Sequence, residues 1–164
     1  MEHPPPRSKR KPEPSARERA LTLLARREHT RCELAAKLAP HVEEPAALQA
    51  LLDDLTVRGW LSEARVVDQV VHAKRGRLGP ARIRRALLER GVPEELIAPA
   101  LKKLNETEIT QARSVWARKF RTPPDDGAGQ ARQVRFLQSR GFSVEVAMRV
   151  VRRGGGGNES DSGD

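Results

Sequence analysis

Apolar residues recur along this chain at the three- and four-residue spacing of amphipathic helices, with polar residues between them. The clearest stripe consists of leucines at i, i+3, i+4 and i+7, namely Leu48, Leu51, Leu52 and Leu55. Glycine, proline and capping residues interrupt such stripes at short intervals. The pattern therefore predicts a chain of short helices, each of which buries one apolar face.

Three of the predicted helices end at a glycine in the same sequence context. A leucine lies four residues before the glycine, an arginine directly before it and a glutamate four residues after it. The copies are Leu55/Arg58/Gly59/Glu63, Leu87/Arg90/Gly91/Glu95 and Leu137/Arg140/Gly141/Glu145. Each predicts a helix C-terminus, because glycine adopts the left-handed conformation cheaply and arginine suits the helix dipole. The repetition predicts a tandem helical array, whose small modules are stabilised by stacking on their neighbours.

Capping signals divide the predicted helices into modules. In the first module, residues 16–60, Ser15 with Glu18 and Thr30 with Glu33 form capping boxes before the first two helices. A third, leucine-rich helix follows and ends at the first repeat glycine. This segment is therefore predicted to be a three-helix unit.

The second module spans residues 62–104. Ser62 is the predicted cap of its first helix, and Pro80 and Pro93 mark the starts of the next two. The first helix carries four valines, which have weak helix propensity, so a β-strand over residues 66–71 is the alternative.

The third module spans residues 107–153, and Thr107 is the predicted cap of its first helix. Residues 122–129 (TPPDDGAG) are predicted to form a loop. A helix follows that ends at Gly141, and Ser143 caps the last helix. We therefore expect an all-α fold, a tandem array of three three-helix, helix-turn-helix-like modules that is elongated and curved.

Both ends of the chain lack residues that build a core. Residues 1–15 contain five prolines among basic side chains, and residues 154–164 are glycine-rich and acidic with no apolar residue. Such compositions predict disordered tails.

Composition limits the function. The 164 residues carry a net charge of +9 and one cysteine, so no internal disulfide forms. The first residues lack the apolar core of a signal peptide, and no apolar run approaches the roughly 20 residues of a membrane span. We expect a soluble, cytoplasmic monomer that attracts polyanions or an acidic protein groove.

Catalytic and metal-binding patterns are missing. The four histidines form no metal-spaced pair, and there is no CxxC pair, phosphate loop or nucleophile elbow. Adjacent acids at 43–44, 53–54 and 125–126 are expected to be solvated. We therefore expect a protein that is not an enzyme and that needs no metal or cofactor.

Aromatic residues are too few to form a base-stacking platform. Trp60, Phe142 and, at the matching place, Val92 directly follow the repeat glycines and are expected to pack in the core. Cys32 is expected to be a small, partly buried residue.

Basic residues concentrate between 74 and 90, where seven lysines and arginines face one acid, Glu89. A solvated arginine-rich face is the simpler interpretation of any single arginine, but one-sign charge at this density favours a binding role. A second group follows in the third module. The predicted contact residues for a polyanion or an acidic protein groove are Arg75, Arg77, Arg82, Arg85, Arg118, Lys119, Arg132 and Arg135.

Residues 80–104 also fit a helix-turn-helix DNA reader. Its reading helix would begin with Glu94 and Glu95, whose carboxylates would meet phosphate. A sequence-specific or architectural protein for double-stranded DNA, acting in transcription, is the first alternative, and a nonspecific nucleic-acid-coating protein is the second.

Several segments together resemble the bacterial RecX regulators of RecA. The resemblance covers about residues 16–153 and is most specific in the second module. It is carried by residues 24–34 (LARREHTRCEL), 59–65 (GWLSEAR), 75–83 (RGRLGPARI), Leu87-x-x-Arg90-Gly91-Val92, Lys119-Phe120 and Phe136-Leu137-x-x-Arg140-Gly141-Phe142. The family usually has an acidic pair and then an aromatic residue after the first repeat glycine, where this chain has Ser62-Glu63 and then Val66.

The resemblance implies three three-helix modules that lie in the helical groove of the RecA filament on DNA. There such a protein limits ATP hydrolysis, strand exchange or filament growth by RecA in recombination, DNA repair and the SOS response. RecA is therefore the expected partner, with single- or double-stranded DNA as a possible second contact.

Overall fold

The computed structural model describes residues 13–154, and helices account for most of them. Their bounds are α1 Ala16–Leu24, α2 Arg31–Leu38, the 3₁₀ helix η1 Ala39–His41, α3 Pro45–Val57, α4 Glu63–Lys74, α5 Pro80–Glu89, α6 Glu94–Glu106, α7 Glu108–Lys119, α8 Gly127–Ser139 and α9 Val144–Arg152. The described residues contain no strand, so the all-α prediction is confirmed. The strand alternative for residues 66–71 is wrong. Nearly all of both predicted tails lies outside the described residues.

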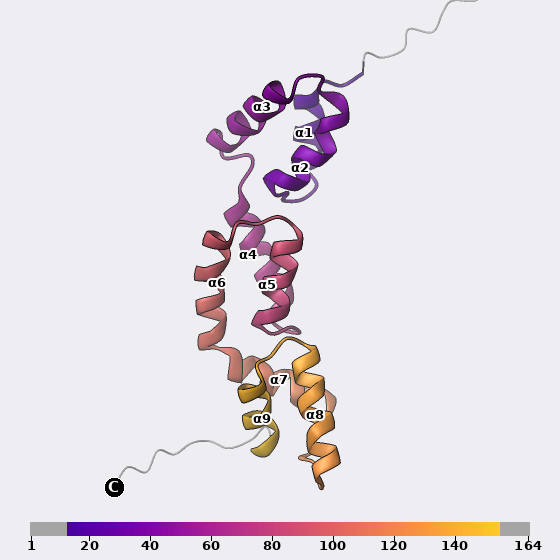
Figure 1. Cartoon of the computed structure of the whole chain (residues 1–164), viewed down its shortest axis with the longest axis vertical. Coiled ribbons are helices and arrows are strands. Elements are labelled where there is room, and N and C mark those ends of the chain that lie inside the picture. Colours follow the sequence, from indigo (N-terminus) through magenta and orange to yellow (C-terminus); the bar gives the residue numbers. More distant parts are fainter. Residues whose placement is uncertain (1–12, 155–164) are drawn as a thin grey trace, which may run out of the picture.

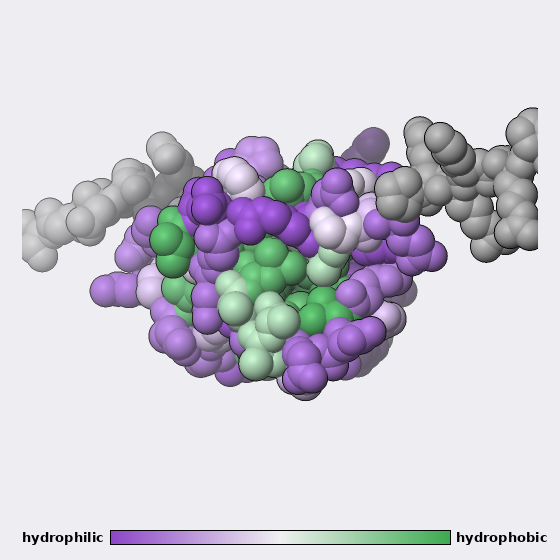
Figure 2. All heavy atoms as spheres, turned by 90° about the horizontal axis from the view of Figure 1, so that it is seen from above, coloured by the Kyte–Doolittle hydropathy of each residue, from purple (hydrophilic) through white to green (hydrophobic). Residues whose placement is uncertain are grey.

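Three three-helix domains follow one another along the long axis of the molecule (Figure 1). Each has its own apolar core, which includes Leu34 and Leu52 in the first domain, Ile83 in the second, and Trp116 and Leu137 in the third. Viewed from above, apolar residues gather within a hydrophilic rim (Figure 2). No helix in residues 13–154 is long and apolar enough to cross a membrane.

Side-chain caps begin several helices as the sequence predicts. Both capping boxes form, at Ser15 with Glu18 and at Thr30 with Glu33, and the hydroxyl of Ser62 accepts the N–H of Arg65. Ser143 caps α9 in the same way. These caps satisfy backbone donors that a helix start leaves unpaired.

Two local predictions in the third domain differ from the structure. Thr107 is the N-cap residue of α7, so the predicted boundary is confirmed, but its side chain makes no capping hydrogen bond, because its hydroxyl donates back to the Leu104 carbonyl at 3.2 Å. The predicted loop over 122–129 is shorter, since α8 already begins at Gly127. The Asp126 carboxylate accepts the Gly129 N–H at 2.6 Å and so extends the helix into a glycine-rich segment.

The repeat glycines end their helices as predicted. Gly59, Gly91 and Gly141 have φ of 71°, 77° and 92°. In each copy the glycine N–H and the next N–H bond to carbonyls of the last helical turn, and the second of these carbonyls belongs to the repeat leucine. This is the Schellman arrangement, which satisfies otherwise unpaired carbonyls.

The copies do not occupy equivalent places, however. Gly59 ends α3 and leads into the second domain, whereas Gly91 and Gly141 end α5 and α8, the second helices of their domains. The second helix of the first domain instead runs into η1. The sequence repeat is therefore out of register with the domains.

Side chains after the repeat glycines also differ. Val92 and Phe142 are buried as predicted, each 3% exposed, but Trp60 is 43% exposed and the prediction for it is wrong. Leu61 takes the core position instead, because the N–H groups of both residues bond to the Leu55 carbonyl. Cys32 is exposed rather than partly buried.

The domains are joined by end-to-end docking of their second helices. At the first joint, between domains one and two, the Thr30 hydroxyl at the start of α2 donates to the Arg90 carbonyl at the end of α5, at 2.6 Å. At the second joint, the N–H groups of Gly79 and Ala81 at the start of α5 donate to the carbonyls of Arg140 and Gly141, at 2.8 and 3.2 Å. The positive end of one helix dipole thus meets the negative end of the next.

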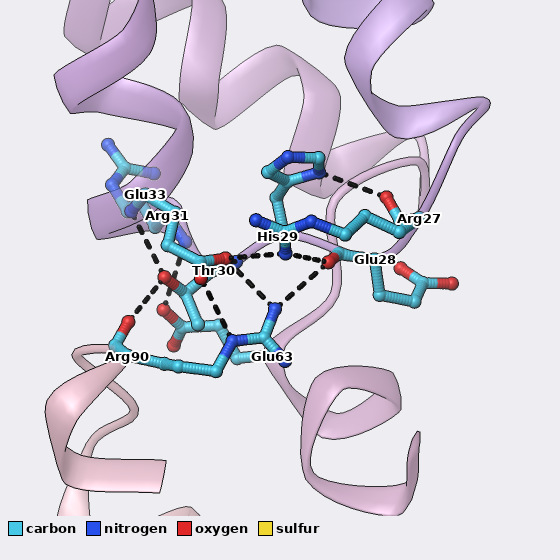
Figure 3. A network of polar contacts seen from close by, with 8 residues as sticks. All are labelled: Arg27, Glu28, His29, Thr30, Arg31, Glu33, Glu63 and Arg90. Atoms are coloured by element: carbon cyan, nitrogen blue, oxygen red, sulfur yellow. Dashed lines mark hydrogen bonds and ion pairs between the residues drawn. The ribbon is translucent and has the colours of Figure 1, made fainter. Parts of the chain in front are cut away.

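A network of ion pairs completes the first joint (Figure 3). Arg90 donates to both oxygens of the Glu33 carboxylate at 2.9 and 3.0 Å, and to the Glu28 carbonyl. Glu63 accepts the Arg31 N–H from across the joint. Burial raises the pKa of Glu33, but hydrogen bonds from Arg90, Thr30 and Arg27 outweigh it and hold this pKa at about 2.

Close approach at the second joint leaves no room for a side chain. A Cβ added to Gly141 would lie 2.6 Å from the backbone nitrogen of Arg82, whereas one added to Gly59 would meet nothing within 4 Å. We expect Gly59→Ala to lower the free energy of unfolding by about 1 kcal/mol, the cost of a left-handed alanine. Gly141→Ala should cost at least about twice as much, because α5 and α8 must also separate. Equal losses in urea unfolding would contradict this docking.

The low pKa of Glu33 makes the first joint sensitive to acid. A carboxyl whose pKa is lower in the folded than in the unfolded chain stabilises the fold above its ordinary pKa, here 4.5, and loses this effect as pH falls toward the folded value. Wild type should therefore be more stable than Glu33→Gln at neutral pH. The difference in urea midpoint should narrow between about pH 5 and pH 2. A difference that is independent of pH would show that Glu33 does not act through its charge.

Candidate binding surface

Four cationic side chains converge on a hollow at the second joint. Arg77 comes from the turn before α5, Arg118 and Lys119 from the end of α7, and Arg140 from the end of α8. The hollow has a volume of about 260 Å³, and Val115 and Phe136 complete its lining, which contains no acid. We call this site the basic hollow.

Two of these cations are held by neighbouring groups. The Arg118 guanidinium donates to the carbonyls of Ser114, at 3.2 Å, and of Gly76, and so ties α7 to the second domain. The Arg140 guanidinium lies over the Phe136 ring, 5.2 Å from its centroid. Such contacts reduce the conformational entropy that an arginine loses when it binds a ligand.

All four cations are exposed, and the other two, Arg77 and Lys119, have no hydrogen-bond or ion-pair partner among the described residues. Within residues 13–154, no carboxylate lies within ion-pair distance of any of the four. Like charges gathered without counter-charges repel one another and attract anions. The hollow is therefore suited to an anionic ligand.

The first joint shows how an equivalent arginine is neutralised. Arg90 precedes Gly91, which docks on α2, and Arg140 precedes Gly141, which docks on α5. Arg90 pairs with Glu33, the third residue of α2. The third position of α5 is Arg82. The second joint therefore has no acid at the position where Glu33 pairs with Arg90, and Arg140 is available to the hollow.

Of the predicted contact residues, the structure brings Arg77, Arg118 and Lys119 together. Arg75 lies two residues before Arg77, at the end of α4, and lines a separate groove of about 410 Å³ between α4 and α6. Arg132 and Arg135 are exposed on α8; Arg132 lies four residues before Phe136 and Arg135 directly precedes it. None of these three arginines has a carboxylate partner among the described residues either: Arg75, Arg132 and Arg135.

Arg82 and Arg85 lie outside the hollow. Arg82 donates from Nε to the Ser139 carbonyl at 3.0 Å, and Arg85 pairs with Glu89 at 2.9 Å. Arg84, in the same dense sequence cluster, pairs with Glu94. Several arginines of the most basic segment of the sequence are thus engaged in contacts within the protein.

Arg140 is the lining residue that the sequence analysis did not select as a contact. It was assigned only to a helix end, as the arginine of the third repeat copy. That copy was the available signal, because a residue beside a docking glycine lies at a joint. The corresponding residue of the second copy, Arg90, shows that this position in the repeat does not by itself determine the role of the arginine.

Models of one family match all three domains. They are described as the first, second and third three-helix domains of RecX and match residues 16–55, 62–101 and 106–151. The regulatory protein RecX of Leptothrix cholodnii is 52% identical over 142 residues, 87% of this chain and 90% of that protein. That of Ralstonia pickettii is 41% identical over 137 residues, 84% of this chain and 86% of that protein.

Solved structures show the same fold. The crystal structure of RecX from Lactobacillus salivarius has a TM-score of 0.69 at 19% identity, and covers 84% of this chain and 93% of its own. A second crystal structure, of a regulatory protein RecX, has a TM-score of 0.70 at 21% identity. The match covers 82% of this chain and 70% of that chain. At these identities the likeness concerns the fold alone.

Arg82 and Arg85 allow a comparison of an arginine that bonds across the second joint with one that pairs within its own helix. We expect Arg82→Ala to lower the free energy of unfolding by about 1 kcal/mol, because it removes the hydrogen bond to Ser139 across the second joint. Arg85→Ala removes only an exposed pair within α5 and should change stability by less than about 0.5 kcal/mol. Thermal and urea unfolding measure the change in the free energy of unfolding for each variant. Equal changes would contradict the role of Arg82 in the second joint.

Proposed function

Because this chain belongs to the RecX family, we propose that it regulates RecA, mainly as an inhibitor. It binds along the groove of the RecA–DNA filament and modulates ATP hydrolysis, strand exchange and filament growth in recombination and the DNA damage response. It acts in the cytoplasm as a monomer and without a cofactor. The observation that carries this proposal is the array of three domains with an acid-free basic hollow at its second joint.

The elongated arrangement suits a filament partner. Three domains in a row present contacts to successive protomers, and linked contacts strengthen one another through effective concentration. The joints support this role, since docked helix ends and ion pairs hold neighbouring domains together. Weak individual contacts therefore suffice for tight binding to an assembled filament.

The basic side chains supply the contacts. Arg77, Arg118 and Lys119 line the hollow at the second joint, Arg75 lines the groove between α4 and α6, and Arg132 and Arg135 extend the charge along α8. Arginine forms strong paired hydrogen bonds with both carboxylate and phosphate. Arg82 and Arg85 belong to the proposed contact set only if the filament displaces their internal partners.

A double-stranded DNA reader remains the alternative function. Its reading helix would be α6, but Glu94 at the start of α6 already holds Arg84, which would otherwise be a cation for phosphate. This arrangement favours a structural role for the start of α6. Sequence-selective, salt-sensitive duplex binding without RecA would support the alternative.

ATP hydrolysis by preassembled RecA filaments on single-stranded DNA tests the proposal. With this protein added well below one molecule per RecA protomer, we expect hydrolysis to fall, because one array affects several protomers. A competitor for DNA must instead cover the strand. Inhibition that begins only when the protein matches the available DNA sites, and that disappears in salt, would contradict the proposal.

A further inference from the structure

We infer that the basic hollow binds the phosphodiester backbone of single-stranded nucleic acid. The inference deepens the proposed function and takes its setting from it, because a filament assembled on a single strand contains this ligand. It names a specific contact, with Arg77, Arg118, Lys119 and Arg140 as the residues that hold the phosphate. The contact can also be measured without RecA.

The size and chemistry of the hollow suit a phosphate. Its volume of about 260 Å³ lies just below the roughly 300–1,000 Å³ of pockets for drug-sized ligands. It thus accommodates one phosphate with its neighbouring atoms. Arg118 and Arg140 are held in place by internal contacts, whereas Arg77 and Lys119, which have no such contacts among the described residues, can adjust around the ligand.

Basic residues beyond the hollow favour a nucleic acid over an acidic protein segment. Arg75 lies at the end of α4, Arg121 two residues after α7, and Arg132 and Arg135 on α8; all are exposed. A nucleic-acid strand presents one negative charge per nucleotide and can use such an extended set. An acidic protein segment presents fewer charges in a less regular spacing.

The contact should not depend on base sequence. The Phe136 ring, the aromatic group that lines the hollow, has the Arg140 guanidinium over it and contacts Phe120 edge to face with ring centroids 5.2 Å apart. It is therefore poorly placed for base stacking. The first joint supports a functional role for Arg140, because its counterpart Arg90 is neutralised by Glu33 while Arg140 has no acid beside it.

The probe is a fluorescently labelled oligothymidylate, and fluorescence anisotropy measures its Kd at several salt concentrations. The test variant is Arg77→Gln with Lys119→Gln, since neither side chain has a hydrogen-bond or ion-pair partner among the described residues. The control is Lys37→Gln with Lys102→Gln, which removes the same charge from exposed positions outside the hollow. Circular dichroism checks that all three proteins keep their helices.

We expect the test variant to bind at least about tenfold more weakly at low salt, with a salt slope reduced by about 1.4 for two lost phosphate contacts on a single strand. The control should change Kd by less than about twofold. Arg77→Lys with Lys119→Arg should keep both affinity and slope, because it preserves the charges. Equal losses in test and control variants would overturn the inference, since binding would then be diffuse.

Two further outcomes separate the inference from the proposed function. If wild type does not bind the oligonucleotide but the test variant loses inhibition of RecA, the hollow contacts protein and the phosphodiester assignment is wrong. If the hollow binds DNA as expected while substoichiometric protein leaves RecA hydrolysis unchanged, the inference holds and the proposed function fails.

Discussion

End-to-end docking of α5 on α2 and of α8 on α5 is the contact on which the array depends. It requires that a helix end without a side chain at its last turn, because the start of the next helix occupies that space. Glycine meets this requirement and also adopts the left-handed φ that closes the helix. One residue type therefore sets both where α5 and α8 end and how closely neighbouring domains approach.

Docking also determines where charge gathers. At the second joint the turn before α5 meets the end of α8, and this meeting places Arg77 beside Arg140 although they are far apart in sequence. Arg118 reinforces the arrangement, since it binds the Gly76 carbonyl from the third domain. The basic hollow is thus a consequence of the joint, and the fold that positions the domains also builds the candidate site.

The sequence predicted local features well because they depend on short-range rules. Capping boxes, the caps at Ser62 and Ser143, and the left-handed glycines follow from residues within a few positions of one another. Exposure of Trp60 did not follow, because it depends on a turn in which Leu61 reaches the core one residue later. The start of α8 was misplaced since the Asp126 cap outweighs the low helix propensity of two glycines.

The candidate site was harder to predict, because the density of basic residues along the chain does not show which of their side chains lack a partner in the folded protein. Arg82, Arg84 and Arg85 stand close together in sequence and are each occupied by an internal partner.

The two joints show the reason in physical terms. A glutamate at the third position of α2 neutralises Arg90 and forms a structural contact, whereas an arginine at the third position of α5 leaves Arg140 with uncompensated neighbours. The residue at this one position of the first helical turn thus determines whether the arginine before the docking glycine has a carboxylate partner at the joint. Predicting this outcome requires knowledge of which helix ends meet, which the chain order alone does not provide.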